Sequence, residues 1–180
     1  LWVIEHALLQ CRQWQDMGLP TKVAVNISAR NLLDSELPDD VEKLLVKHRV
    51  TPDYLELEIT ESAIVADPER ALDILTKLHD RGVHISIDDF GTGYSSLAHL
   101  KKLPVSSLKI DASFVSDMTD DENDAIIVRS TVDLSHNLGL NVIAEGVEDQ
   151  ETLDILKVLH CDHAQGFFIC RPIPAADVTE

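Results

Sequence analysis

Basic side chains are scarce in this chain. Its 180 residues include 15 Lys and Arg against 32 Asp and Glu, which gives a formal net charge of −17. Proteins that follow a nucleic-acid backbone use Lys and Arg to displace counterions, so this charge balance argues against DNA or RNA polymers as partners. A small anionic ligand is compatible with the sequence if bound metal ions reverse the local field.

Cysteine and long apolar runs are also rare. Cys11, Cys161 and Cys170 form no CxxC pair and are odd in number, which favours reduced thiols and a cytoplasmic location over a disulfide framework. No apolar run approaches the roughly 20 residues that cross a bilayer, so we expect no membrane segment in this chain. Low-complexity runs and linkers are lacking too, which predicts a single domain over residues 1–180.

Strand-length hydrophobic runs alternate with helix-like segments along the chain. The pattern predicts helices at residues 1–17, 39–48, 68–80, 97–101, 122–137 and 150–159. It predicts strands at residues 22–28, 54–60, 84–88, 107–110, 141–144 and 164–169. This alternation is typical of an α/β protein with a parallel sheet.

Acidic residues gather where three of the predicted strands give way to turns. These residues are Glu58, Glu61, Asp88, Asp89, Glu145 and Glu148. The C-terminal ends of parallel strands meet on one face of the fold, so we expect these carboxylates to converge. Convergent carboxylates repel one another unless a cation lies between them, which points to a divalent-metal site and to an enzyme.

Six strands fit two architectures. An open doubly wound sheet can use six, whereas a (β/α)8 barrel needs eight strands and typically about 250 residues. Polar residues end every strand rather than those at one switch point, which favours the barrel. In that interpretation about two strands are missing at the N-terminus of the chain.

Two of the polar features also have a structural interpretation. Asp88 and Asp89 precede Phe90-Gly91-Thr92-Gly93, which is good turn chemistry by itself. The same segment is similar to the metal-binding triplet of kinases, but no His-Arg-Asp segment accompanies it. Lys109 could be a surface lysine, yet its apolar neighbours Leu108 and Ile110 would share the opposite face of the strand. We therefore expect Lys109 to point inward, where a partner is required.

Other polar features favour structural interpretations. Gln165-Gly166 could be a bulge as readily as a functional pair. The cluster of His160, Cys161 and His163 bridges a helix end and a strand start without a second ligand pair, which disfavours a metal site. The Asp120-Asp121-Glu122 run suits a solvated helix start.

Several motifs together resemble those of the EAL-domain family, the bacterial phosphodiesterases that hydrolyse cyclic di-GMP. They are Asn26-Ile27-Ser28, Glu58-Ile59-Thr60-Glu61, Asp88-Asp89-Phe90-Gly91-Thr92-Gly93-Tyr94-Ser95-Ser96-Leu97, Leu108-Lys109-Ile110-Asp111, Ala144-Glu145-Gly146-Val147-Glu148 and Gln165-Gly166-Phe167. The resemblance covers essentially the whole chain and implies a TIM-like barrel, here with about six of its eight strands. The Glu-Ala-Leu signature is expected upstream of residue 1, because the segment 5–9 is not that motif and falls in a predicted helix.

The resemblance implies a two-metal site. Asn26, Glu58 and Asp88 would bind the first ion, together with the glutamate of the missing signature. Asp88 would bridge to the second ion, held also by Asp89 and anchored by Glu145. Oxygen ligands suit Mg²⁺ or Mn²⁺ rather than zinc.

The resemblance also assigns supporting roles. Lys109, with Glu145 as its catalytic neighbour, would position or polarise the attacking water, and Glu148 and Gln165 would support the water network. Glu61 would brace the loop that begins at Asp89. That loop, formed by Phe90, Gly91, Thr92 and Gly93 and continuing to Ser96, would communicate with a homodimer contact.

Three functions are compatible with these residues. The leading one is metal-dependent hydrolysis of cyclic di-GMP to linear pGpG, in a parent protein that carries a GGDEF or sensor domain upstream. A non-catalytic relative that binds cyclic di-GMP or a protein partner is the alternative, and an enolase-like barrel enzyme is more distant. By itself, the chain is expected to bind metal poorly, to hydrolyse slowly and to associate through an exposed sheet edge.

Overall fold

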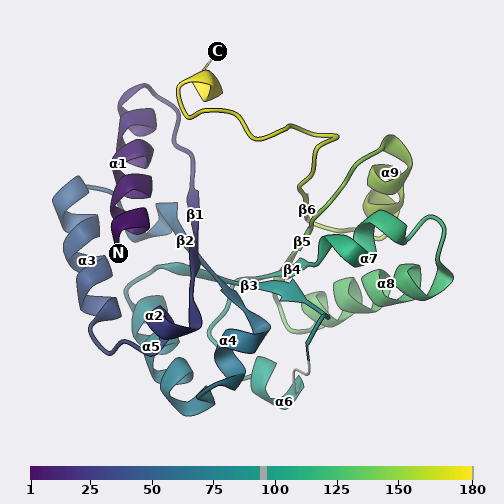
Figure 1. The fold of residues 1–180 in the computed structure, drawn as a ribbon, viewed down its shortest axis with the longest axis horizontal. Coiled ribbons are helices and arrows are strands. Elements are labelled where there is room, and N and C mark those ends of the chain that lie inside the picture. Colours follow the sequence, from purple (N-terminus) through teal and green to yellow (C-terminus); the bar gives the residue numbers. More distant parts are fainter. Residues whose placement is uncertain (94–96, 180) are drawn as a thin grey trace. The chain divides into compact units, whose positions relative to one another are not determined.

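The computed structural model describes residues 1–93 and 97–179, and its strands form one sheet (Figure 1). The six strands lie in the sheet in chain order, and each is followed along the chain by helix before the next begins. The pairs β1–β2, β4–β5 and β5–β6 are parallel. The predicted α/β architecture is therefore confirmed.

The bounds of the strands are as follows: β1 (Val23–Ile27), β2 (Leu55–Thr60), β3 (His84–Phe90), β4 (Ser107–Ile110), β5 (Asn141–Ala144) and β6 (His163–Ala164). The helices are α1 (Trp2–Asp16), α2 (Ala29–Leu32), α3 (Leu37–His48), α4 (Glu61–Val65), α5 (Pro68–Asp80), α6 (Leu97–Leu100), α7 (Ala112–Asp117), α8 (Glu122–Asn137) and α9 (Gln150–Val158). Two 3₁₀ turns, η1 (Pro52–Tyr54) and η2 (Asp177–Thr179), complete the described elements.

The chain divides into two compact units, and the boundary falls inside β3. Unit 1 holds the described residues up to Ile87 and those from 97 to 106. Unit 2 holds Asp88–Gly93 and the chain from Ser107 onward. That residues 1–180 act as a single domain stays a prediction.

Unit 1 is built on alternating strands and amphipathic helices. In β1 and β2 every second residue is buried, so Val25 and Leu57 face the core while Asn26 and Glu58 face the other way. Helix α5 begins at Asp67, whose side chain accepts a hydrogen bond from the Arg70 N–H, and Pro68 suits its first turn. Its buried stripe consists of Ala71, Ile74, Leu75 and Leu78.

Unit 2 has a continuous apolar core under its parallel strands. All four residues of β4 are buried, including Lys109. The core is made of Ile110, Val115, Met118, Val128, Val132, Val142, Ala144, Val147 and Leu156. These residues come from β4, α7, α8, β5, α9 and the turn after β5, so the core fixes where the C-terminal ends of β4 and β5 lie.

The sixth predicted strand is wrong in its extent. It was expected over residues 164–169, but β6 pairs with β5 only at His163 and Ala164. Beyond Ala164 the backbone turns to the segment after β5: the Val147 N–H donates to the Gln165 carbonyl (3.0 Å), and the Phe168 N–H donates to the Val147 carbonyl (3.0 Å). These bonds replace the ladder that a longer strand would form.

The remaining predicted elements are present, and their ends match the prediction or differ from it by at most two residues. Strand β3 is two residues longer than expected, because Asp89 and Phe90 continue it. The short helices α2, α4 and α7 follow strands directly and were not predicted from the sequence. Membrane-crossing helices are missing from the described part of the chain: none combines the required length with the required apolar character.

One carboxylate ties β5 to its flanking segments in unit 2. Asp162 Oδ2 accepts a hydrogen bond from the Val142 N–H (2.8 Å) and contacts His136 Nε2 (3.0 Å). Burial acts to raise the pKa of Asp162, but these hydrogen bonds lower it, and on balance it lies below the ordinary value of 3.8. A lowered pKa in the folded state stabilises the protein at neutral pH, and the contribution is lost as pH falls through the folded value.

We expect Asp162→Ala to destabilise the fold by about 1–2 kcal/mol at pH 7, because it leaves the Val142 N–H without its acceptor. Chemical denaturation measures the difference. Asp154→Ala is the matched control, because the contacts of Asp154 with Lys157 and Gln150 are exposed and contribute little to stability. The gap between Asp162→Ala and the wild type should shrink as pH falls below about 4. Equal stability losses in the two variants at pH 7 would contradict this account.

Candidate metal centre

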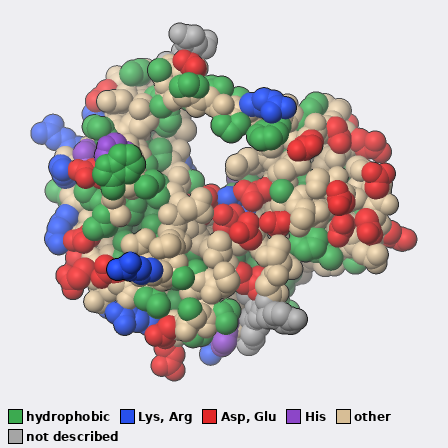
Figure 2. Space-filling view, in the orientation of Figure 1, with side chains coloured by type: hydrophobic (Ala, Val, Ile, Leu, Met, Phe, Trp, Pro, Cys, Tyr) green, Lys and Arg blue, Asp and Glu red, His purple; other side chains and the backbone are tan. Residues whose placement is uncertain are grey.

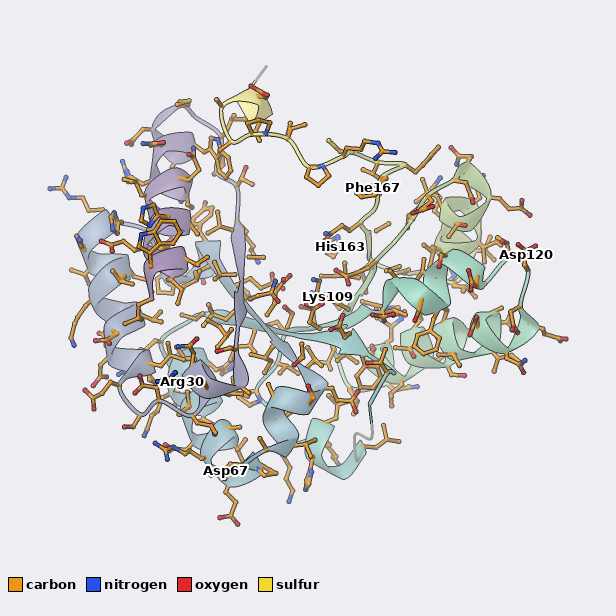
Figure 3. The ribbon with its side chains drawn as sticks, in the orientation of Figure 1. Arg30, Asp67, Lys109, Asp120, His163 and Phe167 are labelled. Atoms are coloured by element: carbon orange, nitrogen blue, oxygen red, sulfur yellow. The ribbon has the colours of Figure 1, made fainter. Side chains whose placement is uncertain are left out.

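Lys109, which is labelled in Figure 3, lies beside two carboxylates in unit 2. It is 4% exposed, and its Nζ lies 2.7 Å from Glu145 Oε1 and 3.0 Å from Asp88 Oδ1. An unpaired ammonium at this depth would be costly, so the two carboxylates are what hold the charge inside. The inward orientation expected for Lys109 is thus observed.

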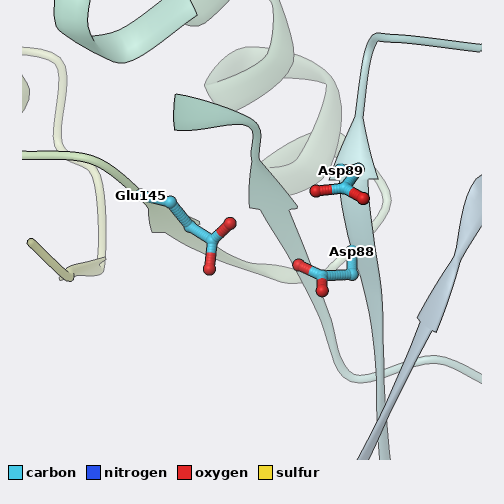
Figure 4. A group of neighbouring side chains, drawn as sticks. All are labelled: Asp88, Asp89 and Glu145. Atoms are coloured by element: carbon cyan, nitrogen blue, oxygen red, sulfur yellow. The ribbon is translucent and has the colours of Figure 1, made fainter. Parts of the chain in front are cut away.

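Three carboxylates lie close enough together to share a cation. Asp88, Asp89 and Glu145 each offer an oxygen within 4.8 Å of the other two. Figure 4 shows the Asp88 and Glu145 side chains turned toward one another from different strands, with Asp89 beside them. Among the described residues, no other group of three or more Asp, Glu, His or Cys side chains meets this criterion. His160, Cys161 and His163 therefore form no such group.

The local charge is strongly negative. Burial raises the pKa of Asp89, and the nearby carboxyl groups of Asp88, Asp111 and Glu145 raise it further. The Lys109 ammonium forms ion pairs with two of these four carboxyl groups, those of Asp88 and Glu145. Figure 2 shows further Asp and Glu side chains over the helices of unit 2. A bound cation would relieve the repulsion that the lysine leaves uncompensated.

Asp111 belongs to this group, and the sequence analysis gave it no role. Its carboxylate accepts hydrogen bonds from the Ser113 N–H (2.8 Å) and from the Ser113 hydroxyl, which lower its pKa, and it also bonds to the Asp89 side chain. A usable signal was present, since Asp111 lies two residues after Lys109 and side chains alternate along a strand. It was missed because an Asp after a strand is also an ordinary helix cap.

The backbone places the carboxylates with local constraints. Asp89 has φ of 53°, a left-handed conformation that is uncommon outside glycine and that turns its side chain away from the regular strand alternation. The Glu145 N–H donates to the Ile110 carbonyl (3.1 Å), which extends the β4–β5 pairing by one residue. Both acids are therefore held by backbone geometry rather than by side-chain contacts alone.

Asn26 and Glu58 are brought together within unit 1. They are register partners in the parallel β1–β2 pair and lie on the same side of it. Asp88 belongs to unit 2, so their joint ligation of a first metal ion stays a prediction. A metal ion held by both Asn26 and Glu58 would require them to be neighbours, as they are in unit 1.

Glu61 is buried without a hydrogen-bond partner. It begins α4, is 4% exposed, and neither carboxylate oxygen is hydrogen-bonded within the described residues. A buried carboxylate of this kind requires a donor. The predicted role of Glu61 as a brace for the loop after Asp89 is not tested, because residues 94–96 of that loop lie outside the described residues.

The first part of that loop is described. Phe90 is buried, and the Thr92 hydroxyl donates a hydrogen bond to the Asp89 carbonyl (2.9 Å). Gly91 has φ of 103°, which other residues rarely adopt, and Gly93 is exposed. The chain therefore turns sharply directly after the acidic pair.

Glu148 and Gln165 are exposed, and their predicted roles in a water network stay predictions. The backbone of Gln165 is nevertheless fixed, since its N–H donates to the Ala144 carbonyl (2.8 Å) and its carbonyl accepts from Val147. Gly166 packs against the Val147 backbone so closely that no side chain could be accommodated. This arrangement holds Gln165 beside the segment that carries Glu145.

The donor set fits a hard divalent cation. Every candidate ligand is a carboxylate oxygen except the amide oxygen of Asn26, and Mg²⁺ and Mn²⁺ prefer such oxygen donors. Asp88 Oδ1 accepts no well-oriented hydrogen bond from the described residues, although it lies in ion-pair range of Lys109. A buried oxygen in that state is suited to a metal ligand.

Comparison with known protein families matches the chain to one family. The family model described as "EAL domain" matches residues 1–172. The chain belongs to the EAL domain family. This is the family that the motifs around Glu58, Asp88, Lys109 and Glu145 resemble.

Several EAL proteins are similar to the chain along nearly its full length. It is 45% identical over 175 residues to the bifunctional diguanylate cyclase/cyclic di-GMP phosphodiesterase MucR of Pseudomonas aeruginosa, which covers 97% of this chain and 26% of MucR. It is 39% identical to the cyclic di-GMP phosphodiesterase NbdA of the same organism, covering 99% of this chain and 23% of NbdA. The chain thus spans about a quarter of the length of these relatives.

Solved structures show the same fold. The PaMucR phosphodiesterase in its c-di-GMP complex superposes with a TM-score of 0.94 at 44% identity, over 98% of this chain and 72% of that one. The EAL domain of DcpA from Mycobacterium smegmatis gives a TM-score of 0.94 at 37% identity, over 98% of this chain and 80% of that one.

We expect Mn²⁺ to stabilise the protein against heat, because a ligand that binds only the folded state adds about 2.7 kcal/mol at a concentration of 100 Kd. Glu145→Gln and Asp88→Asn should lose most of this Mn²⁺-dependent gain. Glu151→Gln, which changes an exposed residue in the first turn of α9, should keep it. Thermal unfolding of each variant is measured with and without Mn²⁺. The difference between the two measurements excludes the effect of the substitution on the metal-free protein. An undiminished gain in Glu145→Gln would exclude this carboxylate as a ligand.

Proposed function

We propose that the protein to which this chain belongs carries out metal-dependent hydrolysis of cyclic di-GMP to linear pGpG, and that residues 1–180 alone do so more slowly. The observation that carries the proposal is the buried Lys109 held between Asp88 and Glu145, inside a chain that matches the EAL family over residues 1–172. The names of the relatives and the c-di-GMP complex of PaMucR support the choice of substrate. We also propose that residues 1–180 act as a single domain.

The proposed cofactors are two Mg²⁺ or Mn²⁺ ions. When bound, such ions neutralise the phosphodiester, lower the pKa of a bound water and align its attack. Asp88, Asp89 and Glu145 would hold one ion, and Asn26, Glu58 and Asp88 the other. The three carboxylates that offer oxygens within 4.8 Å of one another support this assignment.

The proposed role of Lys109 follows from its position. Its ammonium lies among the acids, where it would orient and polarise a water molecule and lessen the charge that builds up on the phosphoryl oxygens. The water oxygen forms a bond to phosphorus while one bridging P–O bond breaks, and the departing oxygen takes up a proton. Asp88 and Glu145 fix Nζ in place, which limits the reorganisation needed during reaction.

The surrounding assignments are proposals as well. Glu148 and Gln165 would order water near Glu145, and Glu61 would brace the loop of Phe90–Gly93. A GGDEF or sensor domain in the parent protein is suggested by the bifunctional name of MucR. The cytoplasmic location rests on the cysteine pattern of the sequence.

Lys109→Met should reduce the kcat for cyclic di-GMP by about 100-fold or more while leaving KM within a small factor, because the residue acts on the reacting water rather than on substrate affinity. The assay follows conversion to pGpG by chromatography, with Mg²⁺ and Mn²⁺ tested separately. Lys43→Met, which alters an exposed lysine of unit 1, is the control and should match the wild type.

The outcomes separate the two main functions. A wild-type protein that binds cyclic di-GMP in calorimetry but never yields pGpG, with either metal, would be the non-catalytic relative. Unchanged turnover in Lys109→Met would assign the lysine a structural role only.

We further propose a homodimer whose stability depends on the loop that begins at Asp89. Gly91 and Gly93 make this backbone easy to rearrange, and Asp89 links it to the carboxylate group. Mg²⁺ with substrate should therefore tighten self-association by several-fold in analytical ultracentrifugation. Asp89→Asn should weaken this response, whereas Asp80→Asn at the end of α5 should not. A dimer affinity that is indifferent to metal and substrate would contradict the coupling.

A further inference from the structure

The short helix α7 lies between the two segments that carry the carboxylates. It begins directly after Asp111 at the end of β4, and its first turn contacts the turns that follow both β3 and β5. We propose that this first turn sets the separation between Asp88–Asp89 and Glu145, with Ala112 and Phe114 as positioning residues. The inference rests on the proposed function only in taking these carboxylates as metal ligands.

The contact with the Glu145 turn involves Ala112. Gly146, directly after Glu145, has φ of 73°, and a Cβ built on it would lie 2.6 Å from Ala112 Cβ and 3.0 Å from Ala112 Cα. Real Cβ atoms essentially never approach other atoms as closely as 2.6 Å. The backbone of Gly146 therefore rests directly on Ala112, and any side chain at position 146 would push Glu145 away from α7.

The contact with the Asp89 turn involves Phe114. A Cβ built on Gly91 would lie 3.0 Å from Phe114 Cε2 and 3.7 Å from Cδ2 and Cζ. Gly91 follows Asp89 by two residues, so the aromatic ring limits how far this turn can move toward α7. The ring is half-buried and packs against the core of unit 2, which restricts its own movement.

A third contact from the same turn reaches the acid itself. Asp111 caps α7 through the Ser113 N–H and also hydrogen-bonds to the Asp89 side chain. Asp111, Ala112 and Phe114 thus each touch one of the two carboxylate-bearing segments. Such outer contacts orient metal ligands and are often nearly as important as the ligands.

Helix α7 can impose this spacing because its buried side chains are packed into the core of unit 2. Val115 is fully buried and Met118 nearly so, and both belong to the apolar core shared with α8 and β5. A well-packed core resists small displacements, so the positions of Ala112 and Phe114 are set by unit 2 as a whole.

A simpler explanation is that glycine is needed at position 146 only because the backbone there is left-handed. The chain offers a matched control, since Gly139 has φ of 76° and a Cβ built there meets nothing within 4 Å. Alanine at either position incurs the same backbone strain. Only alanine at position 146 also collides with α7.

The test compares Gly146→Ala with Gly139→Ala in the whole chain, with no substrate present. Mn²⁺ affinity is measured from the signal of free Mn²⁺ in electron paramagnetic resonance. We expect Gly146→Ala to weaken binding by about tenfold to a hundredfold, and Gly139→Ala to bind as the wild type does. Adding Ala112→Gly to Gly146→Ala should recover part of the loss, because it removes the atom at 2.6 Å. Equal affinities in the two alanine variants, or no recovery in the double variant, would overturn the proposal.

A second comparison applies if Gly146→Ala does not fold. Ala112→Gly alone removes the contact without adding a clash and should weaken Mn²⁺ binding several-fold. Ala7→Gly makes the same substitution within helix α1 of unit 1, which contains neither turn, and should not. Unchanged Mn²⁺ affinity in Ala112→Gly would count against the proposal that α7 sets the separation of the carboxylates.

The two proposals fail separately. If Gly146→Ala weakens Mn²⁺ binding but the wild type yields no pGpG, the positioning role of α7 is supported and the proposed function fails. If the wild type hydrolyses cyclic di-GMP and Gly146→Ala binds Mn²⁺ normally, only the positioning role of α7 is contradicted.

Discussion

Repulsion among partly buried carboxylates is the constraint on which the rest of unit 2 depends. Carboxylate oxygens of Asp88, Asp89 and Glu145 lie within 4.8 Å of one another, and the Lys109 ammonium forms ion pairs with Asp88 and Glu145. In a medium of low dielectric constant such a group is unstable unless it is held by a rigid frame and compensated by cations. The fold supplies the frame through parallel strands that end together, and the excess negative charge favours a divalent ion.

The same constraint explains several local irregularities. Asp89 takes a left-handed conformation that directs its carboxylate to the group, and Gly91 and Gly146 let the following turns pack against α7. Residues that violate local preferences tend to lie at functional sites, where the surrounding packing holds them in place. Here the packing comes from the apolar core of unit 2, which is dense around Val115 and Val142.

Much of the fold was predictable because its signals are local. Helix α5 ends at Asp80, as its apolar stripe and the glycine at position 82 predict, and β4 and β5 match their hydrophobic runs residue for residue. The final strand was not predictable: its pattern continues beyond Ala164, but the backbone after Ala164 hydrogen-bonds to Val147 and does not extend the β5–β6 pairing. Helix α7 was missed because six residues carry little periodic signal, and its stability comes from burying Val115.

The sequence by itself determined the chemistry of the site: acids after strands, a lysine flanked by apolar residues, and motifs shared with one family. These are properties of residue type and order, which need no coordinates. Only the tertiary structure decided which acids meet, that Asp111 joins them, and that Ala112 and Phe114 separate the two turns that carry them. The reason is physical, because such contacts join positions from three different strand ends, and their distances are set by the packing of the core rather than by any local pattern.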